Sequence, residues 1–497
     1  MLYTERIAMR RNEIWARMGP KNEEIGFIGQ SLRKQMIKEH DFIAIGGGSG
    51  GYNAARVARQ YSDNVAIIDG AKELGGLCIL KGCMPSKTLI YSAEVLHLAQ
   101  QGTRFGLSIP EAKVDMKALH KRKLATIKEF TDYRVESMES GKFHLYRNFA
   151  KFISNDTVEL DDGTQLKGKH FIIATGSYVS KPPIPGIDLP EIWTSDDVLD
   201  LSELPESAIV LGGGVVACEL TQFLHRVGCK TIQIQRSPHI LKDQASDVSK
   251  VVEKALIKEG VDLLTDTKLL SISKTDSGFD VTFEHKGTQV TRSAKHVVNA
   301  LGRFPATASL GLENAGIELE PNGQIQTDKY QRTSNPAVYA AGDCTGPFEI
   351  VHTAVLQGEL AAYHASGIEK TPLNYDHMLD VVFTNPQVAR VGLTEKELKK
   401  RNIEYIAADY PFDDHGKSIL MEAKHGFVRL FGEKPTGKIL GAEIVSKDAG
   451  ELIHALSVAV SHGLTAASLL QTHWYHPSLS EIISYPLEDI VDELAVQ

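Results

Sequence analysis

The chain has 497 residues, of which 42% are hydrophobic and 24% charged, and its net charge is -9. This length predicts about three domains. Because the chain is acidic and its positive and negative charges are interspersed, the sequence does not predict a basic surface for binding nucleic acid. No apolar run reaches the roughly 18 residues of a membrane span, so we expect no membrane contact. The five cysteines are too sparse for a secreted disulfide scaffold, which favours a cytoplasmic location.

Residues 1–40 are polar and helix-prone, with apolar Leu2, Ile7 and Trp15 among arginines. They predict an amphipathic helical arm that packs on the body of the protein. The continuous apolar core of a secretory signal is missing. A transit peptide and a partner-docking arm remain alternatives.

From residue 41 the sequence reads as an apolar strand, a glycine turn, a helix and a second strand. Gly46, Gly48 and Gly51 occupy the G-x-G-x-x-G positions, where the backbone approaches a pyrophosphate at the helix N-terminus. Asp69 ends the second strand, where a carboxylate accepts a hydrogen bond from a ribose hydroxyl. The unit predicts a dinucleotide site.

The stretch GGLCILKGCMPSK, residues 75–87, holds Cys78 and Cys83 between glycines. We expect both thiols on the first turn of one helix, within disulfide distance of each other. Such a bond closes a very short loop and adds little stability, and a helix start stabilises a thiolate. A redox-active pair is favoured by this context over two unrelated buried cysteines or half a zinc site.

A second strand–turn–helix–strand unit follows a proline-rich crossing, with Gly212, Gly214 and Ala217 in the fingerprint positions. No acid ends its second strand, because Gln235-Arg236 stands there and Lys242 lies six residues further on. A carboxylate selects NAD, whereas basic groups accommodate the 2′-phosphate of NADP. The unit therefore predicts NADP(H) binding, and solvated surface charge is the alternative explanation of these cations.

Two further segments carry chemistry. NPAVYAAGDC places Asp343 at the carboxyl end of a buried strand, the edge at which α/β folds bind ligands. From about residue 375 alternating strands and two amphipathic helices begin, and HWYHPSLSE lies between those helices. There Glu481 is placed to orient the ring of His476, and an oriented histidine is the usual general base for thiol–disulfide exchange.

In order, the chain shows IGGGSGG, GGLCILKGCMPSK, ATGS, GGGVVACE, LGRFPAT, YAAGDC, FTNPQVARVGLTE and HPSLSE. This series resembles the class I pyridine nucleotide–disulfide oxidoreductases, and is most similar to dihydrolipoamide dehydrogenase. The resemblance implies an α/β fold with two Rossmann-like domains and a C-terminal α+β dimerisation domain. The implied domains are an extension (1–40), an FAD domain with a central segment (41–190 and 297–374), an NAD(P) domain (191–296) and an interface domain (375–497).

By the same resemblance, Cys83 contacts the flavin, Cys78 attacks the substrate, and Lys87 pairs with Glu219 beside the flavin. His476 and Glu481 act on the cysteines of the partner subunit in a homodimer, and no metal is implied. The residues expected to bind the two nucleotides are Gly46, Gly48, Ser49, Gly50, Gly51, Asp69, Gly76, Lys87, Ala150, Thr175, Gly176, Ser177, Gly342, Asp343, Ala354, Gly212, Gly214, Val215, Val216, Glu219, Gln235, Arg236, Lys242 and Gly302.

The implied activity is FAD-dependent transfer of electrons between NAD(P)H and a small-molecule or lipoyl-bound dithiol/disulfide. The P-S-K and VHTA runs match dihydrolipoamide dehydrogenase, whereas Gln235 and the loop Ile79-Leu80-Lys81 depart from it. We expect Lys81 to lower a thiolate pKa. The alternatives are an NADPH-dependent reductase of a glutathione- or mycothione-type disulfide, a mercuric-reductase-like enzyme, and a non-catalytic nucleotide-binding sensor.

Overall fold

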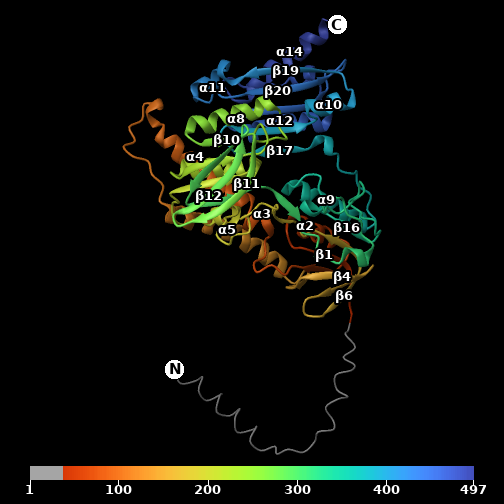
Figure 1. The fold of residues 1–497 in the computed structure, drawn as a ribbon. Coiled ribbons are helices and arrows are strands. Elements are labelled where there is room, and N and C mark those ends of the chain that lie inside the picture. The colour runs from red at the N-terminus through yellow and green to blue at the C-terminus, as the bar shows by residue number, and fades with distance from the viewer. Residues whose placement is uncertain (1–36, 497) are drawn as a thin grey trace, which may run out of the picture.

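The computed structural model describes residues 37–496, and Figure 1 shows three layered regions along the molecule. The N-terminal strands and the teal helix α9 (Val351–Ala365) lie at one end, and the blue C-terminal region lies at the other. The green segment around α8 (Ser246–Glu259) lies between them. The expected N-terminal arm falls outside the described residues, except that residues 38–40 already belong to the first strand and not to a helix.

The first region is built on a seven-stranded sheet in the order β3-β2-β1-β6-β5-β4, with β16 pairing to β6. Its central strands pair in parallel, and they are nearly continuous apolar runs because a parallel sheet is covered on both faces. Helix α2 packs close to the sheet, where a side chain on Gly51 would lie 1.9 Å from the Gly46 carbonyl oxygen. The elements are β1 (Lys38–Ile45), α2 (Ser49–Ala58), β2 (Val65–Ile68), α3 (Gly76–Leu80), α4 (Cys83–Gln100), α5 (Met116–Glu139), β3 (His144–Tyr146), β4 (Ala150–Ser154), β5 (Thr157–Leu160), β6 (Gln165–Ile173) and β16 (Val338–Ala340).

The second region repeats the first unit with a smaller parallel sheet in the order β10-β9-β8-β14. A three-stranded antiparallel sheet, β11-β12-β13, packs beside it through a shared apolar cluster. The elements are β8 (Ser207–Leu211), α7 (Val215–Arg226), β9 (Lys230–Ile234), β10 (Asp262–Leu264), β11 (Thr267–Thr275), β12 (Gly278–His285), β13 (Thr288–Ala294) and β14 (His296–Asn299).

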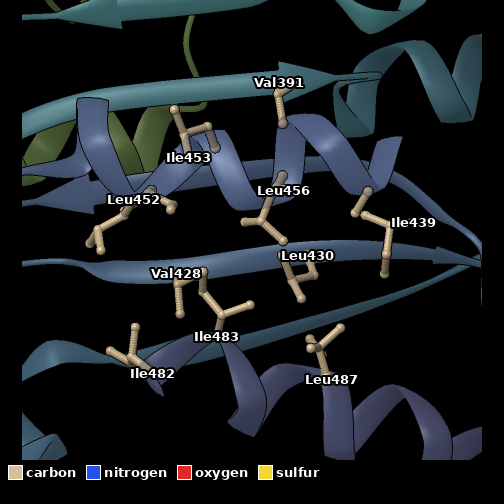
Figure 2. Packing of buried hydrophobic residues seen from close by; sticks show 14 of the residues in the cluster. Val391, Val428, Leu430, Ile439, Leu452, Ile453, Leu456, Ile482, Ile483 and Leu487 are labelled. Atoms are coloured by element: carbon tan, nitrogen blue, oxygen red, sulfur yellow. The ribbon is translucent and has the colours of Figure 1, made fainter. Parts of the chain in front are cut away.

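The C-terminal region is a five-stranded antiparallel sheet in the order β17-β18-β21-β20-β19. Figure 2 shows helix α12 and the segment η7–α14 packed over its strands, and their side chains form one buried cluster. Ile482 and Ile483 of η7 are fully buried there, which fixes the backbone immediately after Glu481. The elements are β17 (Leu379–Val382), β18 (Gln387–Gly392), β19 (Tyr405–Pro411), β20 (Phe427–Glu433), β21 (Ile439–Ser446), α12 (Ala449–His462), η7 (Ser480–Ile483) and α14 (Ser484–Ala495).

The predicted fold class is confirmed, with two parallel-sheet nucleotide-binding units and a C-terminal α+β unit. One local prediction is wrong, because the two thiols do not share a helix. Cys78 lies in the short helix α3, and Cys83 is the first residue of α4. Gly82 separates the two helices, because its backbone angles (φ -131°, ψ -118°) lie outside the helical region and an uninterrupted helix could not contain them. Within residues 37–496 no helix has both the length and the apolarity that crossing a bilayer requires.

Candidate active site

A cavity of about 860 Å³ opens at the carboxyl ends of the first sheet's parallel strands. This is the edge at which open α/β sheets bind ligands. Most residues expected at a nucleotide or redox site on this sheet line it together. They are Gly46, Gly48, Ser49, Gly50, Asp69, Gly76, Cys78, Cys83, Ala150, Thr175, Gly176, Ser177, Gly342, Asp343 and Ala354.

One end of the cavity has the donors and acceptors that an adenine dinucleotide needs. Asp69 directly follows β2 and is held in place because Oδ2 accepts the Gly47 N–H at 3.0 Å and Oδ1 accepts the Ala71 N–H. A side chain on Gly76 would come within 2.6 Å of the Gly48 Cα, so these two backbones approach as only glycines permit. The free N–H groups at the start of α2 can bind a pyrophosphate, and these residues fit FAD.

The other end is held by a polar cluster around Asp343. The Ser177 hydroxyl donates to Asp343 Oδ2 at 2.6 Å, and Arg303 donates to both the hydroxyl and the carbonyl of Ser177 at 2.7 Å. Sequence reasoning missed Arg303, although it stands inside the LGRFPAT motif beside the expected Gly302. Gly302 itself does not line the cavity, and its carbonyl accepts the Ser180 N–H.

Cys78 and Cys83 are free thiols, half-buried in the cavity wall. Hydrogen bonding from Cys78 lowers the pKa of Cys83 below that of a free cysteine, and the Lys87 ammonium lowers it further. The Cys78 pKa is raised, because its thiol is the donor to Cys83 and because burial disfavours a second thiolate. The pair therefore loses its first proton at Cys83, whose position at the N-terminus of α4 also favours the anion.

Lys87 connects helix α4 to two distant parts of the chain. Its Nζ lies 2.8 Å from Glu219 Oε2 on α7 and over the Phe383 ring, 4.7 Å from the centroid. The other Glu219 oxygen accepts the Phe383 N–H at 2.9 Å. Because Glu219 is buried, this ion pair is shielded from solvent and fixes the position of the ammonium near Cys83.

The expectation for Lys81 is wrong. Its side chain is 60% exposed and pairs with Asp196 Oδ2 at 3.0 Å. An exposed cation that already has an anionic partner is screened by water and contributes little field at the thiols. The Cys83 pKa is lowered by Cys78 and Lys87, without a contribution from Lys81 among its main causes.

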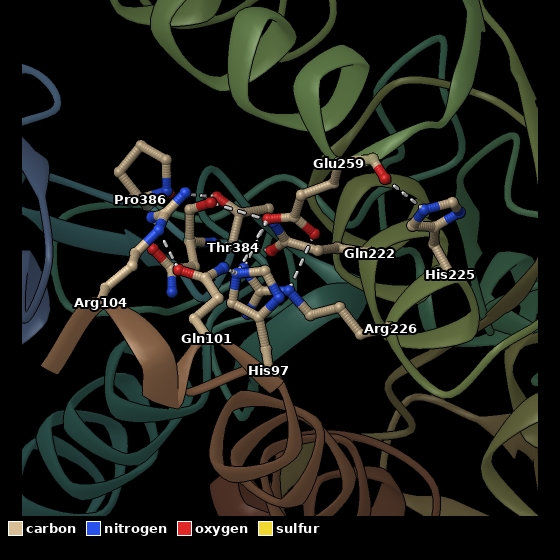
Figure 3. Close-up of polar contacts among 10 residues, drawn as sticks. His97, Gln101, Arg104, Gln222, His225, Arg226, Glu259, Thr384 and Pro386 are labelled. Carbon is tan, nitrogen blue, oxygen red and sulfur yellow. Dashed lines mark hydrogen bonds and ion pairs between the residues drawn. The ribbon is translucent and has the colours of Figure 1, made fainter. Parts of the chain in front are cut away.

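The opposite end of α4 is held by the polar cluster in Figure 3. Arg226 of α7 pairs with Glu259 of α8 through two hydrogen bonds of 2.6 and 2.9 Å, and Gln222 donates to the same carboxylate. His97 of α4 approaches that carboxylate at 4.0 Å, and burial together with the Arg226 charge lowers its pKa to about 4. A neutral His97 therefore packs α4 against the second nucleotide unit.

At the second glycine turn Gln235 occupies the position that Asp69 has in the first. It is buried under Gly213, where an added side chain would meet Gln235 Cδ at 2.7 Å. The Gln235 Oε1 accepts the Arg236 backbone N–H, so an uncharged amide, and not a carboxylate, makes the hydrogen bond at this turn. Of the other expected residues there, Gly214 caps α7, while Val215, Val216, Arg236 and Lys242 are exposed.

The predicted histidine–glutamate pair forms. Both Glu481 oxygens lie 3.0 Å from His476 Nδ1. The Glu481 side chain is only 9% exposed, whereas the His476 side chain is 78% exposed. His476 is absent from the wall of the cavity that holds its own chain's cysteines. The pair thus presents an oriented imidazole outward from the C-terminal region.

Comparison with known proteins matches residues 40–358 to the pyridine nucleotide-disulphide oxidoreductase family and residues 378–486 to its dimerisation domain. Mercuric reductase of Bacillus cereus is 33% identical over 89% of this chain and 70% of its own length. Dihydrolipoyl dehydrogenase of Thermus scotoductus is 34% identical over 90% of this chain and 96% of its own length. The solved structure of LpdA from Mycobacterium tuberculosis superposes with a TM-score of 0.82 at 27% identity, covering 91% of this chain and all of that one.

The match to the family's dimerisation domain indicates that the protein is a homodimer. The cavity and the second glycine turn provide sites for FAD and for an NAD(P)-type nucleotide. The chain belongs to the pyridine nucleotide-disulphide oxidoreductase family and is an FAD-dependent disulfide oxidoreductase.

Proposed function

We propose that this enzyme exchanges electrons between NADP(H) and a small-molecule or lipoyl-bound dithiol/disulfide in the cytoplasm, with Cys78 and Cys83 as the exchanging thiols. The observation that carries the proposal is the placement of both thiols in the wall of one cavity, with Cys83 at the N-terminus of α4, and the pKa values of the two thiols are shifted in opposite directions there. That asymmetry leaves the anion on Cys83 and the proton on Cys78, so the two sulfurs have different roles. FAD, when bound, supplies two-electron transfer between the nicotinamide and this pair.

Reduction of a disulfide substrate begins when Cys78 loses its proton and its sulfur attacks one substrate sulfur. A mixed disulfide forms on Cys78, the substrate S–S bond breaks, and one substrate thiolate leaves. The Cys83 thiolate then attacks Cys78, which releases the second substrate thiolate and forms the Cys78–Cys83 disulfide. The cycle consumes one NADPH and one proton for each disulfide, and it runs in reverse for a dithiol.

The acid–base group in this scheme is the partner's His476. It takes the proton from Cys78 and returns it to the first departing substrate sulfur. Two features support this role: the imidazole is exposed, and Glu481 holds its Nδ1 at 3.0 Å, which leaves Nε2 for the proton transfer. The homodimer brings such an outward-facing group to a second copy of the cysteine cavity.

The choice of NADP(H) rests on Arg236 and Lys242. Both are exposed at the turn where a carboxylate would select NAD, and neither forms a side-chain ion pair with another residue in the described range 37–496. Unpaired cations beside a neutral Gln235 attract a 2′-phosphate and leave the 2′-hydroxyl of NAD without its acceptor.

A steady-state panel tests the proposal, with NADH and NADPH each offered with lipoamide, oxidised glutathione and Hg²⁺. We expect disulfide reduction with NADPH preferred, and loss of about 10- to 100-fold in kcat/KM for NADPH in R236A/K242A, since hydrogen bonds to charged groups are strong. NADH turnover should not change in that variant. The NADP(H) assignment is contradicted if the variant loses the same activity with both nucleotides, or if the wild-type enzyme is active with NADH alone. If Hg²⁺ is the only substrate turned over, the substrate is a metal ion and not a disulfide.

A further inference from the structure

The carboxylate that orients His476 has a second histidine on its other side. His415 follows the short helix η6 (Phe412–Asp414), and its ring is fully buried. Its Nε2 lies 3.3 Å from Glu481 Oε1, the oxygen that also contacts His476 Nδ1 at 3.0 Å. One buried carboxylate therefore lies between an exposed imidazole and a buried one.

The buried ring is held by contacts on every side. Its Nδ1 lies 2.8 Å from the hydroxyl of Ser418, which is also fully buried. The rings of Phe412 and Tyr485 meet it edge-on with centroids 6.4 Å away, and Tyr485 is itself stacked on Tyr410. His415 cannot turn away from Glu481 without disturbing this packing.

The charge of Glu481 selects the tautomer of His415. If the Ser418 hydroxyl donates to Nδ1, the ring proton lies on Nε2 and faces the carboxylate; the other tautomer would turn a lone pair towards a negative charge. The contact does not have the geometry of a hydrogen bond, so the N–H acts on the anion through its dipole across the 3.3 Å between Nε2 and Oε1. Burial lowers the pKa of His415 against the opposing pull of Glu481, which keeps the ring neutral.

Within the described part of the chain, the titratable groups that face this ring besides Glu481 are His476, from the loop before η7, and Tyr485 of α14. Tyr410 of β19 is stacked on Tyr485, and its hydroxyl contacts Asp414. None of them places a second charged donor on Glu481 from the buried side. His415 is thus the group that contacts the Glu481 carboxylate from the buried side.

We propose that His415 is a positioning residue for the reaction, which sets the proton affinity of the His476–Glu481 pair through its N–H on the buried side of the carboxylate. A donor to an anion stabilises the ionised form and lowers its affinity for a proton. Removing that donor makes the pair hold its proton more tightly. The inference rests on the proposed acid–base role of the partner's His476.

Two substitutions of matched chemistry test it. In H415Q the amide N–H reaches about as far as Nε2, whereas in H415N the amide replaces only the Nδ1 side that faces Ser418. Because neutral His476 must accept the proton of Cys78 before the attack, kcat/KM for disulfide reduction rises as pH rises and His476 loses its own proton. We expect H415N to move this acidic limb of kcat/KM to higher pH by about 0.5–1 unit, and H415Q to keep the wild-type profile.

FAD content and the thermal unfolding midpoint are measured alongside, so that loss of packing is seen separately. Equal shifts in both variants, or no shift in H415N, overturn the proposal. If H415N does not fold, S418A decides: without the hydroxyl, part of the population turns the lone pair to Glu481, so a smaller shift in the same direction is expected, and an unmoved limb overturns the proposal. Full activity in H476A would instead defeat the proposed function, whatever the His415 variants do.

Discussion

The redox centre and the acid–base centre are built in opposite ways. Cys78 and Cys83 line a cavity inside the first region, where a helix N-terminus and the Lys87–Glu219 pair adjust their protonation. His476 extends outward from the C-terminal region with 78% of its side chain exposed, although its Glu481 is buried. A general base is useful only within hydrogen-bond reach of its proton, and His476 is absent from the wall of the cavity that holds its own chain's cysteines. With the roles proposed for these residues, the difference teaches that the catalytic unit is the dimer.

The largest effect is expected at the redox centre. In C83S no internal disulfide can close, so disulfide turnover should fall by at least about a thousandfold, while FAD content stays at the wild-type level. Steady-state rates and flavin absorbance measure both quantities. Cys229 is buried in the second region, and C229S is the matched control that should retain activity. Turnover in C83S near the wild-type rate would remove the thiol pair from the reaction.

At the acid–base centre, H476Q should lower kcat/KM by about 10²- to 10⁴-fold, the usual range for losing a general acid–base group. The effect should be largest below the pKa of a free thiol, where Cys78 most needs a base. His473 is exposed in the same loop and provides the control H473Q, which should behave as wild type. If both substitutions have the same small effect, His476 has no special role.

A smaller effect is expected from the buried ion pair. Lys87 lowers the Cys83 pKa, so K87M should raise it by about one unit. The Cys83 thiolate of the reduced enzyme forms as pH rises through this pKa, so at pH 7 the variant holds less thiolate than wild type. The pH dependence of Cys83 alkylation by iodoacetamide, followed by mass spectrometry, measures the shift. An unchanged alkylation profile would show that the ammonium does not act on the thiol.

The smallest effect belongs to Lys81. Because its exposed side chain pairs with Asp196, K81A should leave the same alkylation profile within error of wild type. A shift as large as that of K87M would restore the role expected from the sequence.

Much of the redox centre was predictable because its motifs are local. The glycine turn, Asp69 and the cysteine stretch each read directly from short runs of sequence, and the cavity brings them together. The break between α3 and α4 was missed because it depends on the backbone of Gly82, which composition alone does not reveal.

Long-range contacts were harder to predict. Arg303 could have been found from its motif, whereas its two hydrogen bonds to Ser177 depend on how β15 (Arg303–Pro305) pairs with β7 (Ser177–Val179). His415 carries no local signal, since it meets Glu481 only after β19 and α14 have packed together. Tertiary packing therefore supplies what the motifs lack.

The division of the active site between two subunits can be tested most directly with hybrid dimers. Chains carrying C83S and H476A are co-expressed with different affinity tags, and dimers holding one of each are isolated by two-step purification. If the partner's His476 serves each cysteine pair, one site of the hybrid is intact and the other carries both substitutions, so activity should recover to about half of wild type. A hybrid as inactive as the two parent homodimers would show that each site is built from a single chain.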